Sequence, residues 1–174
     1  ISSVRHIFLC CRKDRGIEQP SDLTGKRIGV PMNTAAEFFL GHYLYLNGLS
    51  ISDVTMININ PDQTAAVLAS GDMDAVVAWQ PNVMAVERLL GDAVTIWPAQ
   101  SDRPLYALTI SRTGLIEAYP DVVESYLRAL KKAEGAARKS PADSMNLTAA
   151  YLGIEEADME VLWPLNTFLL TLDQ

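Results

Sequence analysis

Three short segments of this sequence place polar side chains directly after an apolar, β-prone run and directly before helix-forming residues. They are residues 31–34, 60–63 and 79–81. A helix that begins after a strand presents free backbone N–H groups and a partial positive charge, which suit an anionic or polar ligand. In a parallel sheet the three segments would share the carboxyl edge, where ligands of open α/β sheets bind.

The first segment begins a helix. Thr34 is a favoured N-cap residue, and Glu37 three residues later completes a capping-box pattern. The Thr34 hydroxyl could donate to a ligand oxygen, or it could only cap the helix, and the two roles are compatible. The candidate ligand residues of this segment are Met32, Asn33, Thr34 and Ala35.

The other two segments add amide, carboxylate and indole groups. Asn60 and Asp62 are candidate ligand residues whose alternative role is to start the helix that opens at Pro61. Trp79 could stack on a ring or cover an alkyl chain, and its alternative is a place in the core. Gln80 offers an amide that both donates and accepts hydrogen bonds.

The sequence favours no catalytic or metal-binding reading. It has no nucleophile-elbow, paired-carboxylate or phosphate-loop pattern. Cys10 and Cys11 are adjacent, which disfavours an ordinary disulfide, and we expect buried free thiols. His6 and His42 are far apart and more consistent with structural roles. We therefore predict a protein that is not an enzyme and that needs no cofactor or metal.

Composition excludes other classes. The formal net charge of −7 argues against a nucleic-acid partner. No apolar run approaches the about 20 residues of a membrane span. The 174 residues suffice for one sizeable domain but are short for two complete ones.

The order of predicted elements indicates an α/β fold. Apolar β-prone runs alternate with helical segments that carry Pro or Thr at the start and Gly at the end, which predicts βαβ units and a mainly parallel sheet flanked by helices. After the last predicted strand, residues 105–111, only helices are predicted. On the longest of these helices we expect Val123, Leu127, Leu130 and Ala133 to face inward. The expected strands are 4–11, 27–30, 53–60, 74–79, 93–97 and 105–111, and the expected helices are 34–46, 61–70, 81–90, 119–139, 143–152 and 155–163.

Several motifs occur in the order of a known family. They are Asp22–Leu23 with Gly25–Lys26, then Gly29–Val30–Pro31, then Gly71 with Asp74–Ala75, Trp79 with Pro81, and finally Tyr119–Pro120–Asp121. Over roughly residues 4–140 the sequence resembles the solute-binding proteins of ABC importers for nitrate, sulfonate, taurine and bicarbonate. It also resembles their relatives that bind thiamine-pyrimidine precursors.

The resemblance implies a periplasmic-binding-protein-like fold, in which two α/β lobes close over a ligand. Residues 1–15 would be an interlobe crossing strand, residues 16–98 the ligand-binding second lobe, and residues 99–174 the return crossing and an incomplete helical part of the first lobe. The N-terminal part of that lobe, with any signal peptide, would be missing. The face left exposed is then a candidate homodimer surface.

The resemblance also implies the function. We expect capture of a small polar or anionic solute and delivery to a membrane ABC permease, in a periplasmic or extracytoplasmic location. The alternatives are a ligand-sensing domain of a receptor or regulator and a thiamine-precursor-synthesis-like protein. Two positions depart from the family pattern: Asn33, where Gly or Ser is frequent, and Gln80, where Glu is frequent. Arg103 could supply a charge for an anion, although a solvated surface role is the simpler expectation.

Overall fold

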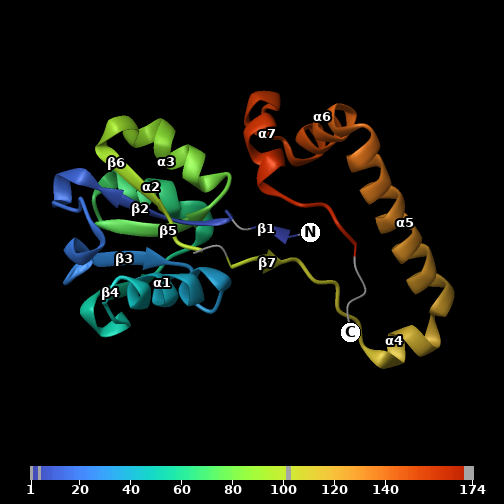
Figure 1. The fold of residues 1–174 in the computed structure, drawn as a ribbon, viewed down its shortest axis with the longest axis horizontal. Coiled ribbons are helices and arrows are strands. Elements are labelled where there is room, and N and C mark those ends of the chain that lie inside the picture. The colour runs from blue at the N-terminus through green and yellow to red at the C-terminus, as the bar shows by residue number, and fades with distance from the viewer. Residues whose placement is uncertain (1, 4, 101–102, 171–174) are drawn as a thin grey trace. The chain divides into compact units, whose positions relative to one another are not determined.

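A computed structural model of the chain describes residues 2–3, 5–100 and 103–170 (Figure 1). Contacts divide the chain into two compact units. The sheet unit comprises Arg5–Arg103, and the helical unit comprises Ile1–Val4 with Pro104–Gln174. Val4, the first residue of the strand expected over 4–11, lies outside the described residues.

The sheet unit contains a five-stranded sheet in the order β4-β3-β5-β2-β6. β3 pairs in parallel with β4 and with β5, whereas β2 pairs antiparallel with both β5 and β6. Because β2 alone is reversed, the other strands point in one direction and the sheet is mixed. The bounds are β2 Ile7–Arg12, β3 Arg27–Val30, β4 Thr55–Asn58, β5 Ala75–Trp79 and β6 Val94–Pro98.

The α/β prediction is therefore confirmed. The strand expected near the start of the chain is β2, which lies between β5 and β6, inside the sheet. Its six residues alternate between the two apolar faces and none is exposed, which is the pattern of a central strand. The assignment of residues 1–15, 16–98 and 99–174 to lobes remains a prediction.

Helices cover both faces of the sheet (Figure 1). α2 and α3 pack on a cluster that includes Cys10, Val76 and Ala78, and the alternate residues of those strands face α1. Tyr43 of α1 stacks on Trp97 of β6, with ring centroids 6.3 Å apart. The helices are α1 Ala35–Leu46, α2 Thr64–Ser70 and α3 Asn82–Leu90, joined by 3-10 turns that include η3 Ile51–Asp53 and η4 Pro61–Gln63.

The two cysteines are consecutive residues of β2, so they point to opposite faces of the sheet, and both are free and buried, as predicted. Burial disfavours the charged thiolate and raises the pKa of Cys10 to about 12, and it raises the pKa of Cys11 as well. Since the thiolate is the reactive form, both thiols are inert core residues rather than nucleophiles.

The helical unit has a short sheet and a series of helices. β1 pairs antiparallel with β7, and Ser2 also exchanges backbone hydrogen bonds of 3.0 and 2.8 Å with Thr167. The strand predicted over 105–111 is wrong beyond its first two residues. The side chains of Leu108 and Ile110 are 79% and 89% exposed. The bounds are β1 Ser2–Ser3, β7 Leu105–Tyr106, α4 Thr113–Ala118, α5 Pro120–Lys139, α6 Pro141–Leu152 and α7 Glu156–Leu162.

The predicted inward face of α5 is also not buried. No residue of α5 is buried, and Leu127 and Ala133 are exposed, while Val123 and Leu130 are half-buried. The apolar stripe is present, but no described part of the unit covers it. No helix in the described part of the chain has the length and apolar character to cross a membrane.

Candidate functional site

The structure brings the ends of β3, β4 and β5 to one edge of the sheet, which we call the carboxyl edge. Because these strands are parallel, the loops that follow Val30, Asn58 and Trp79 leave from the same side. The sequence predicted this shared edge. The ligand-binding role of the residues on it remains a prediction.

In the loop after β3, the Thr34 hydroxyl already makes two hydrogen bonds within the protein. Its oxygen accepts a hydrogen bond of 3.1 Å from the Ala36 N–H and its hydrogen is donated to the Pro31 carbonyl at 2.6 Å. A hydroxyl has a single hydrogen, so donation to a ligand oxygen would require the Pro31 bond to break. Thr34 is thus a helix cap first, and Ala35 is the first residue of α1.

Glu37 also turns back into this loop, but it does not form the expected capping box. Its carboxylate accepts a hydrogen bond of 2.6 Å from the Asn33 N–H, one residue before the N-cap. The cause is the backbone of Asn33, whose φ of 60° is left-handed and turns that N–H toward the helix. Glycine and asparagine tolerate this conformation best, which explains an asparagine where the family pattern often has glycine.

The last residue of β4, Asn58, was not among the predicted ligand residues. The side-chain oxygen of Asn58 accepts a hydrogen bond of 3.1 Å from the Met32 N–H and so ties the first two loops together. Asn60 accepts at 3.1 Å from the Asp62 N–H, which is the helix-start role. The position of Asn58 at the end of an apolar run was the available signal.

The first two loops share a local design. Thr64 donates its hydroxyl hydrogen to the Pro61 carbonyl at 2.6 Å, as Thr34 does to Pro31. Thr64 is almost fully buried, whereas Thr34 is exposed. The Pro-x-x-Thr spacing therefore fixes both turns, and only Thr34 of the two is accessible to a ligand.

The loop after β5 carries the aromatic part of the edge. Trp79 is half-buried, and its ring lies nearly parallel to that of His6, with centroids 6.4 Å apart and an interplanar angle of 18°. Burial lowers the pKa of His6 and so favours the neutral imidazole. The side-chain oxygen of Gln80 accepts a hydrogen bond of 3.2 Å from the Met84 N–H in the first turn of α3. His6 was not predicted here, because only the register Ile7 to Trp79 brings the two rings together.

The edge has no formal positive charge of its own. Residues 31–37, 58–64 and 79–84 contain two carboxylates, Glu37 and Asp62, and no lysine or arginine. An anion bound to this edge would therefore be stabilised by backbone N–H groups and side-chain amides. Arg103 is exposed at the end of the sheet unit. No cluster of metal-ligating side chains occurs among the described residues.

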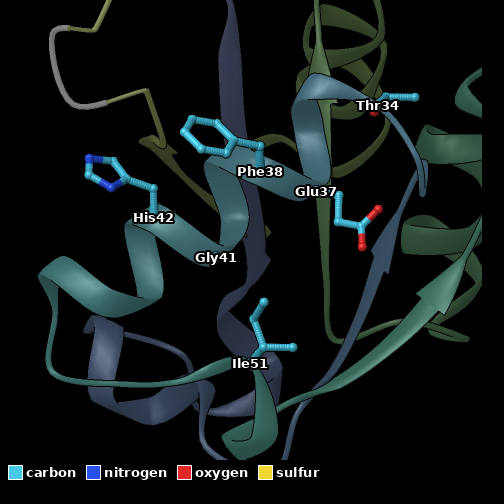
Figure 2. Close-up of a pocket in the computed structure, with 6 residues that line it drawn as sticks. All are labelled: Thr34, Glu37, Phe38, Gly41, His42 and Ile51. Atoms are coloured by element: carbon cyan, nitrogen blue, oxygen red, sulfur yellow. The ribbon is translucent and has the colours of Figure 1, made fainter.

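A groove of about 490 Å³ runs along α1 and begins at Thr34 and Glu37 of the first loop (Figure 2). Phe38 and His42 project from the same side of the helix with nearly parallel rings whose centroids are 6.2 Å apart. Of the predicted ligand residues, Thr34 alone lines this groove. Its lining is Thr34, Glu37, Phe38, Gly41, His42 and Ile51.

The mixed sheet with helices on both faces is an α/β fold, and solved periplasmic sulfonate-binding proteins share it. The alkanesulfonate-binding protein SsuA from Xanthomonas axonopodis pv. citri, bound to MOPS, matches with a TM-score of 0.72 at 22% identity. The match covers 95% of this chain and 56% of that one.

The chain belongs to the NMT1/THI5-like family, whose model matches residues 5–144. Among curated relatives, a putative binding protein of Brucella abortus is 27% identical over 149 residues, which are 83% of this chain and 46% of that protein. The taurine-binding periplasmic protein of Escherichia coli is 27% identical over 162 residues, covering 88% and 50%. The chain thus spans about half the length of the curated relatives it matches.

Enzymes also occur among the matches. The 4,5-dihydroxyphthalate decarboxylase of Pseudomonas putida is 33% identical over 103 residues, which are 42% of this chain and 39% of that protein. A desulfurization enzyme matches in fold with a TM-score of 0.57 at 22% identity, over 89% of this chain and 60% of that one. The first relatives named above are binding proteins, and the fold itself serves both activities.

Proposed function

We propose that this protein binds a small polar or anionic solute, of the sulfonate or taurine class, at the carboxyl edge of its sheet unit. The observation that carries the proposal is the convergence of three loops on one edge, in a chain related to a taurine-binding protein. Delivery of the solute to a membrane ABC permease, outside the cytoplasm, is the physiological role that this binding would serve.

The chemistry of the edge suits such a ligand. The exposed side chains of Asn33 and Asn60 offer amide donors, and the helix N-termini add backbone dipoles for a sulfonate group. The Trp79 indole offers an apolar surface for a short alkyl chain. Since the edge carries no basic side chain, its own affinity is expected to be modest.

Binding can be tested with ¹⁵N-labelled protein titrated with taurine, alkanesulfonates, nitrate, bicarbonate and aminopyrimidines. We expect one class to shift the amide resonances of Asn33, Asn60 and Trp79, and to leave those of Gly25 and Gly71, at the opposite ends of the strands, unchanged. A ligand at about a hundred times its Kd should also raise the melting temperature by about 5–10 °C.

A matched pair of variants locates the ligand. Trp79→Phe should weaken binding, whereas Trp97→Phe, on β6 beside Tyr43, should not. The proposal fails if no member of the panel moves the edge resonances, or if the two variants weaken binding equally.

A second candidate function is catalysis on a small aromatic or sulfur compound, which the decarboxylase and the desulfurization enzyme among the matches favour. Incubating the protein with 4,5-dihydroxyphthalate and with an aromatic sulfinate, and following product release, separates the two. We expect no turnover of the sulfinate by a thiol nucleophile, because both cysteines are buried, and release of product from either compound would favour catalysis. A ligand-sensing role, and a homodimer formed through the exposed face of the helical unit, also remain proposals.

A further inference from the structure

Gln100 is a fully buried polar residue that lies just after β6. Its side-chain oxygen accepts hydrogen bonds from two backbone N–H groups, that of His6 at 2.7 Å and that of Ile7 at 3.3 Å. Its side-chain nitrogen donates to the Arg103 carbonyl at 2.5 Å. A buried amide that makes bonds on both sides is costly to remove, since each partner left behind is unsatisfied.

The position of Gln100 explains why a side chain is used here. Pairing between β2 and β6 runs from Arg12 with Val94 to Phe8 with Pro98, and the Ala99 N–H then donates to the Ile7 carbonyl at 3.0 Å. At the next position the side-chain oxygen of Gln100, in place of a backbone carbonyl, accepts from the N–H groups of His6 and Ile7. The side chain thus continues the pairing of β2 with β6 by one residue.

This step lies where the chain enters and leaves the sheet unit. The unit begins at Arg5 and ends at Arg103. His6 and Ile7 follow the entry directly, and Arg103 is the exit, so one amide group holds both. We call Gln100 with these three partners the Gln100 clamp.

The clamp also reaches the aromatic part of the carboxyl edge. The His6 ring lies beside Trp79, and Ile7 is the register partner of Trp79 across β2 and β5. Holding the backbone at His6 and Ile7 in place therefore also holds the His6 ring, which contacts the Trp79 indole.

We infer that Gln100 is a positioning residue that fastens both chain connections of the sheet unit and, through His6, sets the place of the Trp79 ring. The ligand-related part of the inference rests on the proposed function, whereas the mechanical part does not.

Two substitutions separate the acceptor and donor roles of the amide. Gln100→Leu removes both. Gln100→Glu keeps two acceptor oxygens for His6 and Ile7 but, as a carboxylate, has no hydrogen to give to Arg103. The matched controls are Gln63→Leu and Gln63→Glu, at an exposed glutamine of η4.

Amide hydrogen exchange, the indole resonances and the Arg103 carbonyl resonance of the ligand-free ¹³C,¹⁵N-labelled chain provide the measurement. In Gln100→Leu we expect the amides of His6 and Ile7 to exchange at least about tenfold faster, the equivalent of one buried hydrogen bond. The Arg103 carbonyl loses its donor in both variants, so its ¹³C resonance should shift in both, and in Gln100→Glu it should be the only one of the three sites to respond. The Trp79 indole resonance should shift in the leucine variant and stay in the glutamate variant, while those of Trp97 and Trp163 stay in both.

Three results would overturn the inference. The first is a rate of amide exchange at His6 and Ile7 in Gln100→Leu that stays within about twofold of the wild-type rate. The second is faster exchange at His6 and Ile7 without a shift of the Trp79 indole resonance. Gln100 would then stabilise the backbone without positioning the Trp79 ring. If Gln100→Leu does not fold, Gln100→Glu decides alone, and faster amide exchange at His6 and Ile7 in that variant would refute the separate roles. None of these readouts uses a ligand, so they stand apart from the test of function.

Discussion

The two units of this chain have similar apolar patterning but bury it to very different extents. Among the described residues, only Ala149, Met159 and Leu162 represent the helical unit in the buried apolar set, and all the others lie in the sheet unit. α1 meets a sheet and buries Phe39, Leu40 and Leu44, while the longer α5 buries nothing. An amphipathic stripe thus predicts a helix, but its contribution to stability depends on a covering partner.

The largest expected difference is between leucines of the two helices. Leu40→Ala in α1 removes a fully buried side chain and should lower the free energy of unfolding by about 2–5 kcal/mol. Leu127→Ala in α5, where the side chain is 38% exposed, should cost less than about 1 kcal/mol. Urea denaturation of both variants measures the contrast. A large loss for Leu127→Ala would mean that the stripe on α5 is covered in solution.

A pair of glycines sharpens the comparison at the level of packing. In Gly29→Ala the new Cβ would lie 2.9 Å from Ile59 Cδ1 and 3.2 Å from Met73 Cγ, so we expect a loss of about 1–3 kcal/mol. In Gly135→Ala, inside α5, the new Cβ meets nothing within 4 Å. There the helix propensity of alanine should stabilise the protein by up to about 1 kcal/mol. Thermal unfolding should give shifts of opposite sign, and shifts of the same sign would contradict the packing.

The capped start of α1 should show a smaller effect. Thr34→Ala removes the acceptor for the Ala36 N–H and the donor to Pro31, and we expect a loss of about 1 kcal/mol. Thr34→Ser keeps the hydroxyl and should recover most of it. The α5 helix, whose N-cap residue Tyr119 makes no side-chain cap bond, offers a contrast: Tyr119→Ser should not destabilise the protein through its cap. Urea midpoints test all three, and equal losses for Ala and Ser at position 34 would argue against the cap.

The smallest expected effect is a pH dependence confined to the sheet unit. Burial lowers the pKa of His6 in the folded state, so the unfolded chain binds the proton more readily. The contribution of neutral His6 to the free energy of unfolding is fully present above the pKa of the unfolded state, about 6.5. It is lost as the pH falls through the lower pKa of the folded state. His6→Gln should flatten the fall in urea midpoint below that pH, and His42→Gln serves as the control. An unchanged slope in His6→Gln would assign the dependence to other groups.

Local signals predicted much of the sheet unit. Pro61 in the first turn after Asn60, and Gly71 as the left-handed end of α2, are where the sequence placed them. The cap at Thr34 was predicted too, but the partner of Glu37 was not, because it depends on the positive φ of Asn33. Such signals act within one turn of chain, which is why a sequence reading can find them.

Contacts between segments that are far apart in the chain could not be predicted from the sequence. The place of β2 between β5 and β6 decides that His6 lies beside Trp79 and that Gln100 meets Ile7. Side chains alternate along a strand, so neighbours across a sheet follow from register, and register is fixed by the packing of both faces at once. The strand expected over 105–111 fails beyond Tyr106 for the converse reason, since a strand needs a partner to form.

The sequence by itself therefore determined most of the elements and turns, the family and the three polar loops after the strands. Only the tertiary structure decided which hydroxyls are still available to a ligand and which ring supports Trp79. It also decided which of the apolar stripes are buried. The physical reason is that capping and turn energies depend on residues a few positions apart, whereas burial and strand pairing depend on segments that the chain brings together from far apart.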